Sequence, residues 1–118
     1  VAANLDASDV VWLTDTGSID EADSSIALWK PAGDSSEQYV IGWAEPGSPY
    51  VYRLARIDTA GNFLEGPVDV SAHVQWGRRD DPFRRHYDGD IVWAWFDAPG
   101  STILNFARLE SGNAYDCQ

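Results

Sequence analysis

The sequence predicts an all-β protein, because it contains an internal repeat and because its strand-like stretches are short and bounded by turn residues. The repeat aligns residues 40–45 and 54–58 with residues 92–97 and 106–110, and it places Trp43 on Trp95 and Arg56 on Arg108, both 52 residues apart. Self-similarity at a fixed offset is typical of repeat architectures. The chain is therefore expected to contain two copies of one β-unit.

Stretches rich in Val, Ile, Tyr and Trp predict the strands, and clusters of Gly, Pro, Asp and Ser between them predict the turns. The stretch 18–25 is acidic and lacks an apolar stripe at helical spacing, so a loop is expected there and no helix elsewhere. The expected strands are residues 9–13, 26–29, 39–44, 50–57, 68–70, 83–86, 91–96 and 103–109.

The strand expected at 91–97 is apolar on both faces, since Ile91, Trp93 and Trp95 alternate with apolar Val92, Ala94 and Phe96. This pattern favours a sheet packed between two neighbouring sheets. Radially stacked β-propeller blades provide that environment, and the small residues Gly42, Ala44 and Ala94 suit crowded inner strands. After the first copy, residues 63–71 are expected to form an outer edge strand, with Gly66-Pro67 protecting the edge from further pairing.

The series Trp43-Ala44-Glu45, Leu54-Ala55-Arg56-Ile57-Asp58, Ala60-Gly61-Asn62 and Gly66-Pro67-Val68-Asp69-Val70-Ser71 resembles blades of secreted bacterial β-propellers over residues 26–113. The resemblance implies one all-β domain, residues 1–118, with an N-terminal strand and acidic loop (1–24) and two roughly four-stranded blades (25–72 and 73–118). Propellers close with about 4–8 blades. Other chains are therefore expected to complete the fold, either copies of this chain or another chain of the same precursor, and the alternative is a compact β-sandwich.

Charge and composition limit the partners of the chain. Nineteen acidic residues against eight basic ones give a formal net charge of −11, which repels nucleic acid and anionic lipid surfaces. No apolar run approaches the ~18 residues of a membrane span. The chain starts at Val1 and contains no Met, so a removed leader and a secreted or periplasmic location are expected. The lone Cys117 is either an interchain disulfide partner or a spare thiol on the tail.

The segment 76–86 holds half of the basic residues of an otherwise acidic chain. Clustered guanidiniums beside an indole and an imidazole can clamp a carboxylate, sulfate or phosphate group, while the indole stacks on a ring. The competing interpretation is that the arginines pair with neighbouring aspartates and fix how the two units cross. The candidate ligand-binding residues here are Trp76, Arg78, Arg79, Arg84, Arg85 and His86.

The six tryptophans are the second indication of a binding site, since exposed indoles offer flat apolar faces to sugar rings. Trp43 and Trp95 occupy equivalent strand positions and are expected in the core. Trp12, Trp29 and Trp76 are less constrained, so a carbohydrate site is expected to use these three first.

Oxygen ligands in Asp88-Gly89-Asp90 make calcium a possible cofactor at Asp88 and Asp90, although Asp-Gly between strands is first of all a hairpin signal. With two His and one Cys, structural zinc is not expected.

No motif for a catalytic nucleophile, a zinc-binding helix or a phosphate loop occurs in the sequence. Glu45 and Asp97 occupy matching positions, so they are expected to be structural features at strand ends rather than a catalytic pair. Arg56 with Asp58, and Arg108 with Glu110, are expected to form repeated salt bridges. The sequence predicts a lectin-like, carbohydrate-recognising extracellular module. The alternative is a processed chain or subunit of a larger propeller enzyme, such as a glycan-active hydrolase or lyase.

Overall fold

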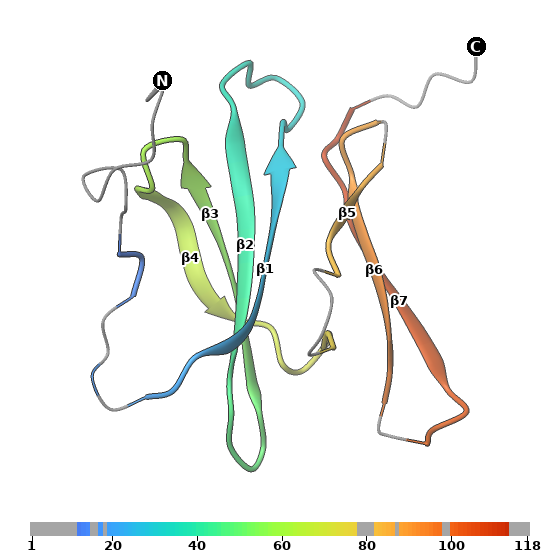
Figure 1. Cartoon of the computed structure of the whole chain (residues 1–118). Helices are drawn as coiled ribbons and strands as arrows, with labels where there is room; N and C mark the ends of the chain where they lie inside the picture. Colours follow the sequence, from blue (N-terminus) through green and yellow to red (C-terminus); the bar gives the residue numbers. More distant parts are fainter. Residues whose placement is uncertain are drawn as a thin grey trace, which may run out of the picture.

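The computed structural model describes residues 12–14, 17, 19–77, 82–86, 88–97 and 100–113. Within these residues the chain is all-β, with two antiparallel sheets of four and three strands and no helix, as the sequence predicted (Figure 1). Strands that follow one another in sequence lie side by side in each sheet, so both sheets are meanders. None of the residues described belongs to a helix of the length and apolar character that crossing a bilayer requires.

The first sheet comprises β1 (Ala22–Trp29), β2 (Gln38–Glu45), β3 (Val51–Asp58) and β4 (Phe63–Asp69), in that order. The second comprises β5 (Arg84–Arg85), β6 (Ile91–Phe96) and β7 (Leu104–Leu109). The prediction of about four strands per unit therefore holds for the first sheet, whereas the second has three within the described residues. Trp12 and Leu13 lie in no strand, and the rest of the strand expected at 9–13 falls outside the described residues.

The 52-residue repeat is reproduced in the pairing of the strands. In the first sheet Tyr39 pairs with Ile57 and Gly42 with Leu54. In the second sheet the residues 52 positions later also pair, Ile91 with Leu109 and Ala94 with Phe106. The hairpins β2–β3 and β6–β7 therefore share one register, and the same side of each hairpin carries equivalent residues.

β1 extends further than the sequence predicted: it starts at Ala22 rather than at 26, and its register shifts between Ala22 and Ser25, where Asp23 has a φ of 54°. β4, Phe63–Asp69, is the edge strand of the first sheet, which confirms the outer edge strand expected at 63–71, and its register shifts opposite Arg56. At Gly66 the φ is +82°, and a Cβ would lie 2.7 Å from the carbonyl oxygen of Leu54, so this position requires glycine.

The two sheets pack face to face over one hydrophobic core. The first sheet contributes Val40 and Leu54, the second contributes Ile91 and Trp93, and the connecting segment contributes Trp76 and Phe83. Ile91 is fully buried and Trp93 is 4% exposed. Trp43 is buried, as predicted, at 6% exposed, but it lies on the face of β2 that is turned away from this core, whereas Trp95 is partly buried against the core.

Gly42 leaves the space that the connecting segment fills. A Cβ at this position would lie 2.8 Å from Cζ of Phe83 and 3.0 Å from Cζ2 of Trp76. Both rings belong to the packed core, so they cannot move away from a larger side chain without displacing their neighbours. The Gly42→Val variant is therefore expected to lose about 1–3 kcal/mol of unfolding free energy through overpacking, measured by urea denaturation.

The matched control is Gly77→Ala, since nothing lies within 4 Å of a Cβ at Gly77. This variant is expected to unfold at nearly the same urea concentration as the parent chain. Equal losses in the two variants would contradict the tight fit assigned to Gly42.

The predicted salt bridges within β3 and β7 are wrong, and the partners lie across the sheet instead. Arg56 pairs with Glu65 on β4, with Nε to Oε1 at 3.3 Å, and it donates to Gln38 on β2. Arg108 pairs with Asp88 and Asp90 rather than with Glu110. Glu65 is directly opposite Arg56 in the register, and directly opposite residues approach more closely than residues two apart on one strand. Asp88 and Asp90 reach Arg108 from the segment just before β6, the neighbour of β7 in the second sheet.

Glu45 and Asp97 behave as structural features, as predicted. Oε2 of Glu45 accepts a hydrogen bond of 3.0 Å from Nε of Arg53. Asp97 accepts a hydrogen bond from Asn105, which stands 52 residues after Arg53. The two carboxylates therefore hold equivalent places at the ends of equivalent hairpins.

Candidate functional site

Trp76, the indole expected to stack on a ligand, is a core residue instead. Its side chain is 3% exposed, and its Nε1 donates a hydrogen bond of 2.9 Å to the carbonyl of Asp23. The ring makes edge contacts with Tyr52, Phe83 and Trp93 at centroid distances of 5.0, 5.3 and 6.0 Å. The prediction that Trp76 contacts a ligand is therefore wrong.

The basic segment does not form one continuous cluster. Arg78 and Arg79 fall outside the described residues. Arg84 and Arg85 form the short exposed strand β5, and Arg84 donates to the carbonyl of Phe83. His86 lies beside Asp88, with Nδ1 to Oδ1 at 3.0 Å. Of these arginines and the histidine, Arg85 is the one whose side chain lines a pocket described below.

Asp88 and Asp90, the residues predicted to bind calcium, hold the start of β6 to the end of β7. Nε of Arg108 lies 2.5 Å from Oδ2 of Asp90, and its Nη2 lies 2.9 Å from Oδ2 of Asp88. The backbone N–H of Ser111 donates to Oδ1 of Asp90 at 2.7 Å. The Asp90 carboxylate, 5% exposed, thus has partners on both oxygens.

These contacts lower the pKa of both carboxyl groups below the usual value near 3.8. For Asp90 the largest cause is the hydrogen bond from the Ser111 backbone, with Arg108 adding to it against the opposing effect of burial. For Asp88 the largest cause is the hydrogen bond from the Asp90 backbone N–H. The same contacts raise the pKa of Arg108. All three side chains therefore stay charged at neutral pH.

No group of three or more His, Cys, Asp and Glu side chains within the described part of the chain is arranged to hold a metal ion. The donor atoms of Asp88 and Asp90 face Arg108 and Ser111, as given above. A calcium site at this pair stays a prediction.

A polar pocket of about 610 Å3 lies where the ends of the two sheets meet. Three segments far apart in sequence form it: the turn after β1, the end of β5 with the following turn, and the stretch after β7. Asn113 connects them, since its Nδ2 lies 2.9 Å from the carbonyl oxygen of Lys30 and 3.0 Å from that of Asp88. The pocket is lined by Lys30, Pro31, Gly33, Asp34, Ser35, Arg85, Asp88 and Asn113.

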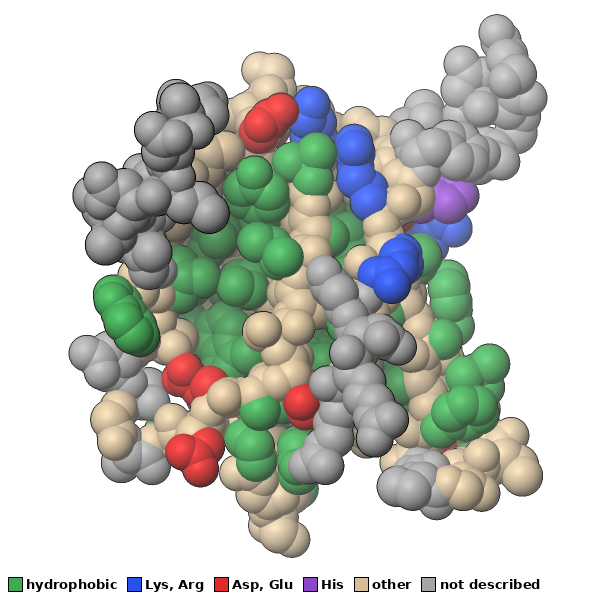
Figure 2. Space-filling view, viewed as in Figure 1, with side chains coloured by type: hydrophobic (Ala, Val, Ile, Leu, Met, Phe, Trp, Pro, Cys, Tyr) green, Lys and Arg blue, Asp and Glu red, His purple; other side chains and the backbone are tan. Residues whose placement is uncertain are grey.

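Both positive and negative groups face this polar pocket. Lys30 lies 3.7 Å from Glu37, an exposed pair that is individually weak. Arg85 has no ion-pair partner within the described residues, which leaves its guanidinium available to a ligand. Hydrogen bonds from Ser36 lower the pKa of Asp34, so Asp34 is an ionised acceptor at neutral pH. Figure 2 shows Lys and Arg side chains gathered in the upper half of the view, where these turns lie.

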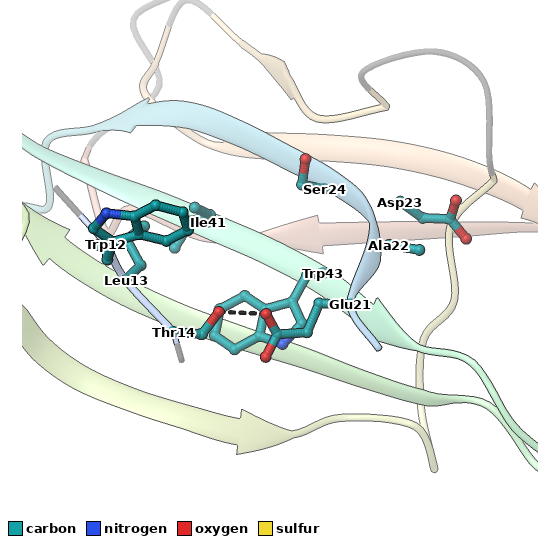
Figure 3. Close-up of a pocket in the computed structure, with 9 residues that line it drawn as sticks. All are labelled: Trp12, Leu13, Thr14, Glu21, Ala22, Asp23, Ser24, Ile41 and Trp43. Atoms are coloured by element: carbon teal, nitrogen blue, oxygen red, sulfur yellow. Dashed lines mark hydrogen bonds between the residues drawn. The ribbon is translucent and has the colours of Figure 1, made fainter. Parts of the chain in front are cut away.

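A second pocket, of about 390 Å3, lies against the face of the first sheet that is turned away from the second sheet. Trp12 is 85% exposed there, which agrees with the expected accessibility (Figure 3). Thr14 donates a hydrogen bond to Glu21 at the rim. The indole N–H of Trp43 is buried and has no hydrogen-bond partner among the described residues.

Trp29, the third predicted aromatic, is half-buried and lines a further pocket of about 420 Å3 between β3, β4 and the end of β7. It packs against the hydrophobic core. Its ring is therefore less available to a ligand than that of Trp12.

Sequence reasoning missed Lys30, Asp34 and Asn113. One signal could have found Asp34, because His86 stands 52 residues after it. The repeat therefore places the turn after β1 and the turn after β5 at the same end of the two sheets. No comparable signal exists for Asn113, whose partners are 83 and 25 residues away.

Comparison with protein-family models, curated proteins and solved structures finds no match for this chain.

Proposed function

We propose that this chain is a pair of β-propeller-like blades that acts as a lectin-like extracellular recognition module, with carbohydrate bound in the polar pocket between the sheet ends. Three observations support the blade arrangement. Each sheet is a meander, the sheets pack face to face, and the hairpins share a register at the 52-residue offset.

The observation that carries the carbohydrate proposal is that Arg85, Lys30 and Asp34 line one open pocket. A sugar hydroxyl both donates and accepts hydrogen bonds. A pocket lined by cationic donors and by an ionised carboxylate satisfies both roles. Its volume of about 610 Å3 falls within the range of small-molecule sites, about 300–1,000 Å3.

A glycan array followed by isothermal titration calorimetry with the best binder tests this proposal. The Arg85→Ala variant is expected to weaken binding by about 10- to 100-fold, since a hydrogen bond to a charged group contributes about 1.5–3 kcal/mol. The fold of the variant is expected to be intact, because the Arg85 side chain is exposed.

The adjacent Arg84 supplies the matched control. Arg84→Ala removes the same charge from the same exposed strand, but Arg84 does not line the pocket, so binding is expected to be nearly unchanged. Equal losses for the two variants would indicate nonspecific electrostatic binding. Loss with Trp12→Ala and retention with Arg85→Ala would place the ligand in the Trp12 pocket and contradict the proposed site.

A further inference from the structure

The face of the second sheet that is turned away from the first is apolar and open. Phe96, Leu104 and Phe106 are 57%, 63% and 66% exposed. Cross-strand pairing places Phe96 beside Leu104 and Ala94 beside Phe106, so the four side chains form one patch, here called the β6–β7 patch. Figure 2 shows hydrophobic side chains at the surface along these strands. The sequence predicted that both faces of β6 are covered, whereas within the described residues one face is not.

The β6–β7 patch has an equivalent in the first sheet, and there it is covered. The residues 52 positions earlier are Gly42, Ala44, Tyr52 and Leu54, paired in the same register. Ala44 is fully buried and Leu54 is 9% exposed, and this side of the first sheet packs on the second sheet through the hydrophobic core. The repeat therefore indicates that a surface like the one packed on Gly42, Ala44, Tyr52 and Leu54 would also fit the β6–β7 patch.

The surface that covers the first sheet includes Trp76 and Phe83 of the connecting segment, together with Ile91 and Trp93 of β6 and Trp95 beside them. Ile91, Trp93 and Trp95 stand 52 positions after Tyr39, Ile41 and Trp43. In the first sheet, those three positions occupy the face turned away from the second sheet, here called the β2 outer face. This face is only partly covered: Trp43 and Ile57 are buried, but Ile26 beside Ile41 is 45% exposed, and Phe63 beside Ile57 is 40% exposed.

Trp12 is a further similarity between the β2 outer face and the face of β6 that packs on the first sheet. Trp12 and Leu13 lie beside Ile41, and Thr14 and Glu21 lie beside Trp43 in the same pocket (Figure 3). Inside the chain, Trp76 lies against Trp93, the equivalent of Ile41, and is 3% exposed because both sheets cover it. Trp12 stays 85% exposed because one sheet lies beneath it and no described residue lies above it. Trp43 lines the same pocket, and its buried indole N–H has no hydrogen-bond partner among the described residues.

We propose that a second copy of this chain docks head to tail, with its β2 outer face and Trp12 against the β6–β7 patch of the first copy. The interface between copies would repeat the interface between the two sheets of one copy. Because it joins two different faces, it is heterologous, and it closes into a ring when the sheets complete a circle. Propellers of about 4–8 sheets correspond to roughly two to four copies. This association does not depend on carbohydrate binding, since the polar pocket lies at the sheet ends.

Sedimentation equilibrium and light scattering over a concentration series test the proposal on the whole chain. The parent chain is expected to form a closed oligomer. Phe106→Glu removes the patch, and Trp12→Glu removes the opposite face, so each variant alone is expected to associate at least about tenfold more weakly, as for a buried aromatic anchor. Both side chains are exposed in one copy, and circular dichroism is expected to show an unchanged fold.

A mixture of the two variants tests whether the patch and the Trp12 face bind each other. Phe106→Glu keeps its Trp12 face and Trp12→Glu keeps its patch, so the mixture is expected to form a 1:1 dimer that grows no further. The control Leu64→Ser changes an apolar side chain that is 46% exposed beside Asp34 and Asp58, away from both faces, and is expected to associate like the parent chain. A monomeric parent chain, self-association of Trp12→Glu at parental strength, or a mixture that stays monomeric would each overturn the proposal.

Discussion

Replacing Trp76 by alanine is expected to lower the free energy of unfolding by about 3–5 kcal/mol, as for other buried tryptophans. Trp76 contacts Tyr52, Phe83 and Trp93, and its Nε1 donates to the carbonyl of Asp23. The substitution opens a cavity at the junction of the two sheets and leaves that carbonyl without its donor. A domain of this size has about 5–15 kcal/mol of total stability, so urea denaturation resolves the change easily.

Two further variants separate packing from hydrogen bonding and from surface effects. Trp76→Phe keeps an aromatic ring and is expected to lose less than the alanine variant. Trp12→Ala removes the same side chain from a site that is 85% exposed, so the stability of one copy is expected to change little. If Trp76→Ala unfolded at the parental urea concentration, the placement of Trp76 in the core would be wrong.

Replacing Asp90 by asparagine is expected to lower the thermal midpoint at pH 7 by roughly 5–10 °C, because Arg108 loses one of its two charged partners and the hydrogen bonds that the buried Asp90 carboxylate accepts are disturbed. The contribution of this carboxylate depends on pH. The contacts with Ser111 and Arg108 hold the pKa of Asp90 below its usual value near 3.8. A group whose pKa is lowered by folding stabilises the protein above its unfolded pKa, and that stabilisation is lost as the pH falls through the folded pKa.

Thermal melts of the parent chain and Asp90→Asn between pH 2 and pH 7 test this prediction. The difference in midpoint is expected to be full at neutral pH and to shrink below about pH 4. Glu110→Gln, which removes one negative charge from an exposed side chain near Arg108 in sequence, is the control and is expected to have little effect. A difference that is the same at pH 3 and pH 7 would show that packing, rather than the charge of Asp90, carries the effect.

Much of the fold could be predicted from the sequence, because strands and turns depend on local patterns. Alternation of apolar residues located β2, β3, β6 and β7 to within about two residues. The 52-residue offset also predicted a shared structural unit, and the pairing register reproduces it. The edge strand expected at 63–71 matches β4, whereas the start of β1 could not be predicted, since its backbone is irregular at Asp23.

The candidate site was predicted in part. Clustered arginines indicated the segment 76–86 as a candidate site, and Arg85 of this segment lines the polar pocket. However, Lys30 and Asn113 reach this pocket from distant segments, and composition gives no sign of that. The assignment of Trp76 to a ligand failed for a related reason, because tryptophans in a core and in a binding site look alike in sequence.

The sequence by itself determined that the chain is all-β, that it carries two equivalent hairpins, and which residues alternate across each strand. These properties follow from backbone geometry, turn chemistry and a two-residue period, which act over short distances. The tertiary structure alone decided the partners of Arg56 and Arg108, the burial of Trp76 and the exposure of Phe96, Leu104 and Phe106. Such contacts join residues far apart in sequence, and they depend on which face of each sheet finds another sheet to cover it.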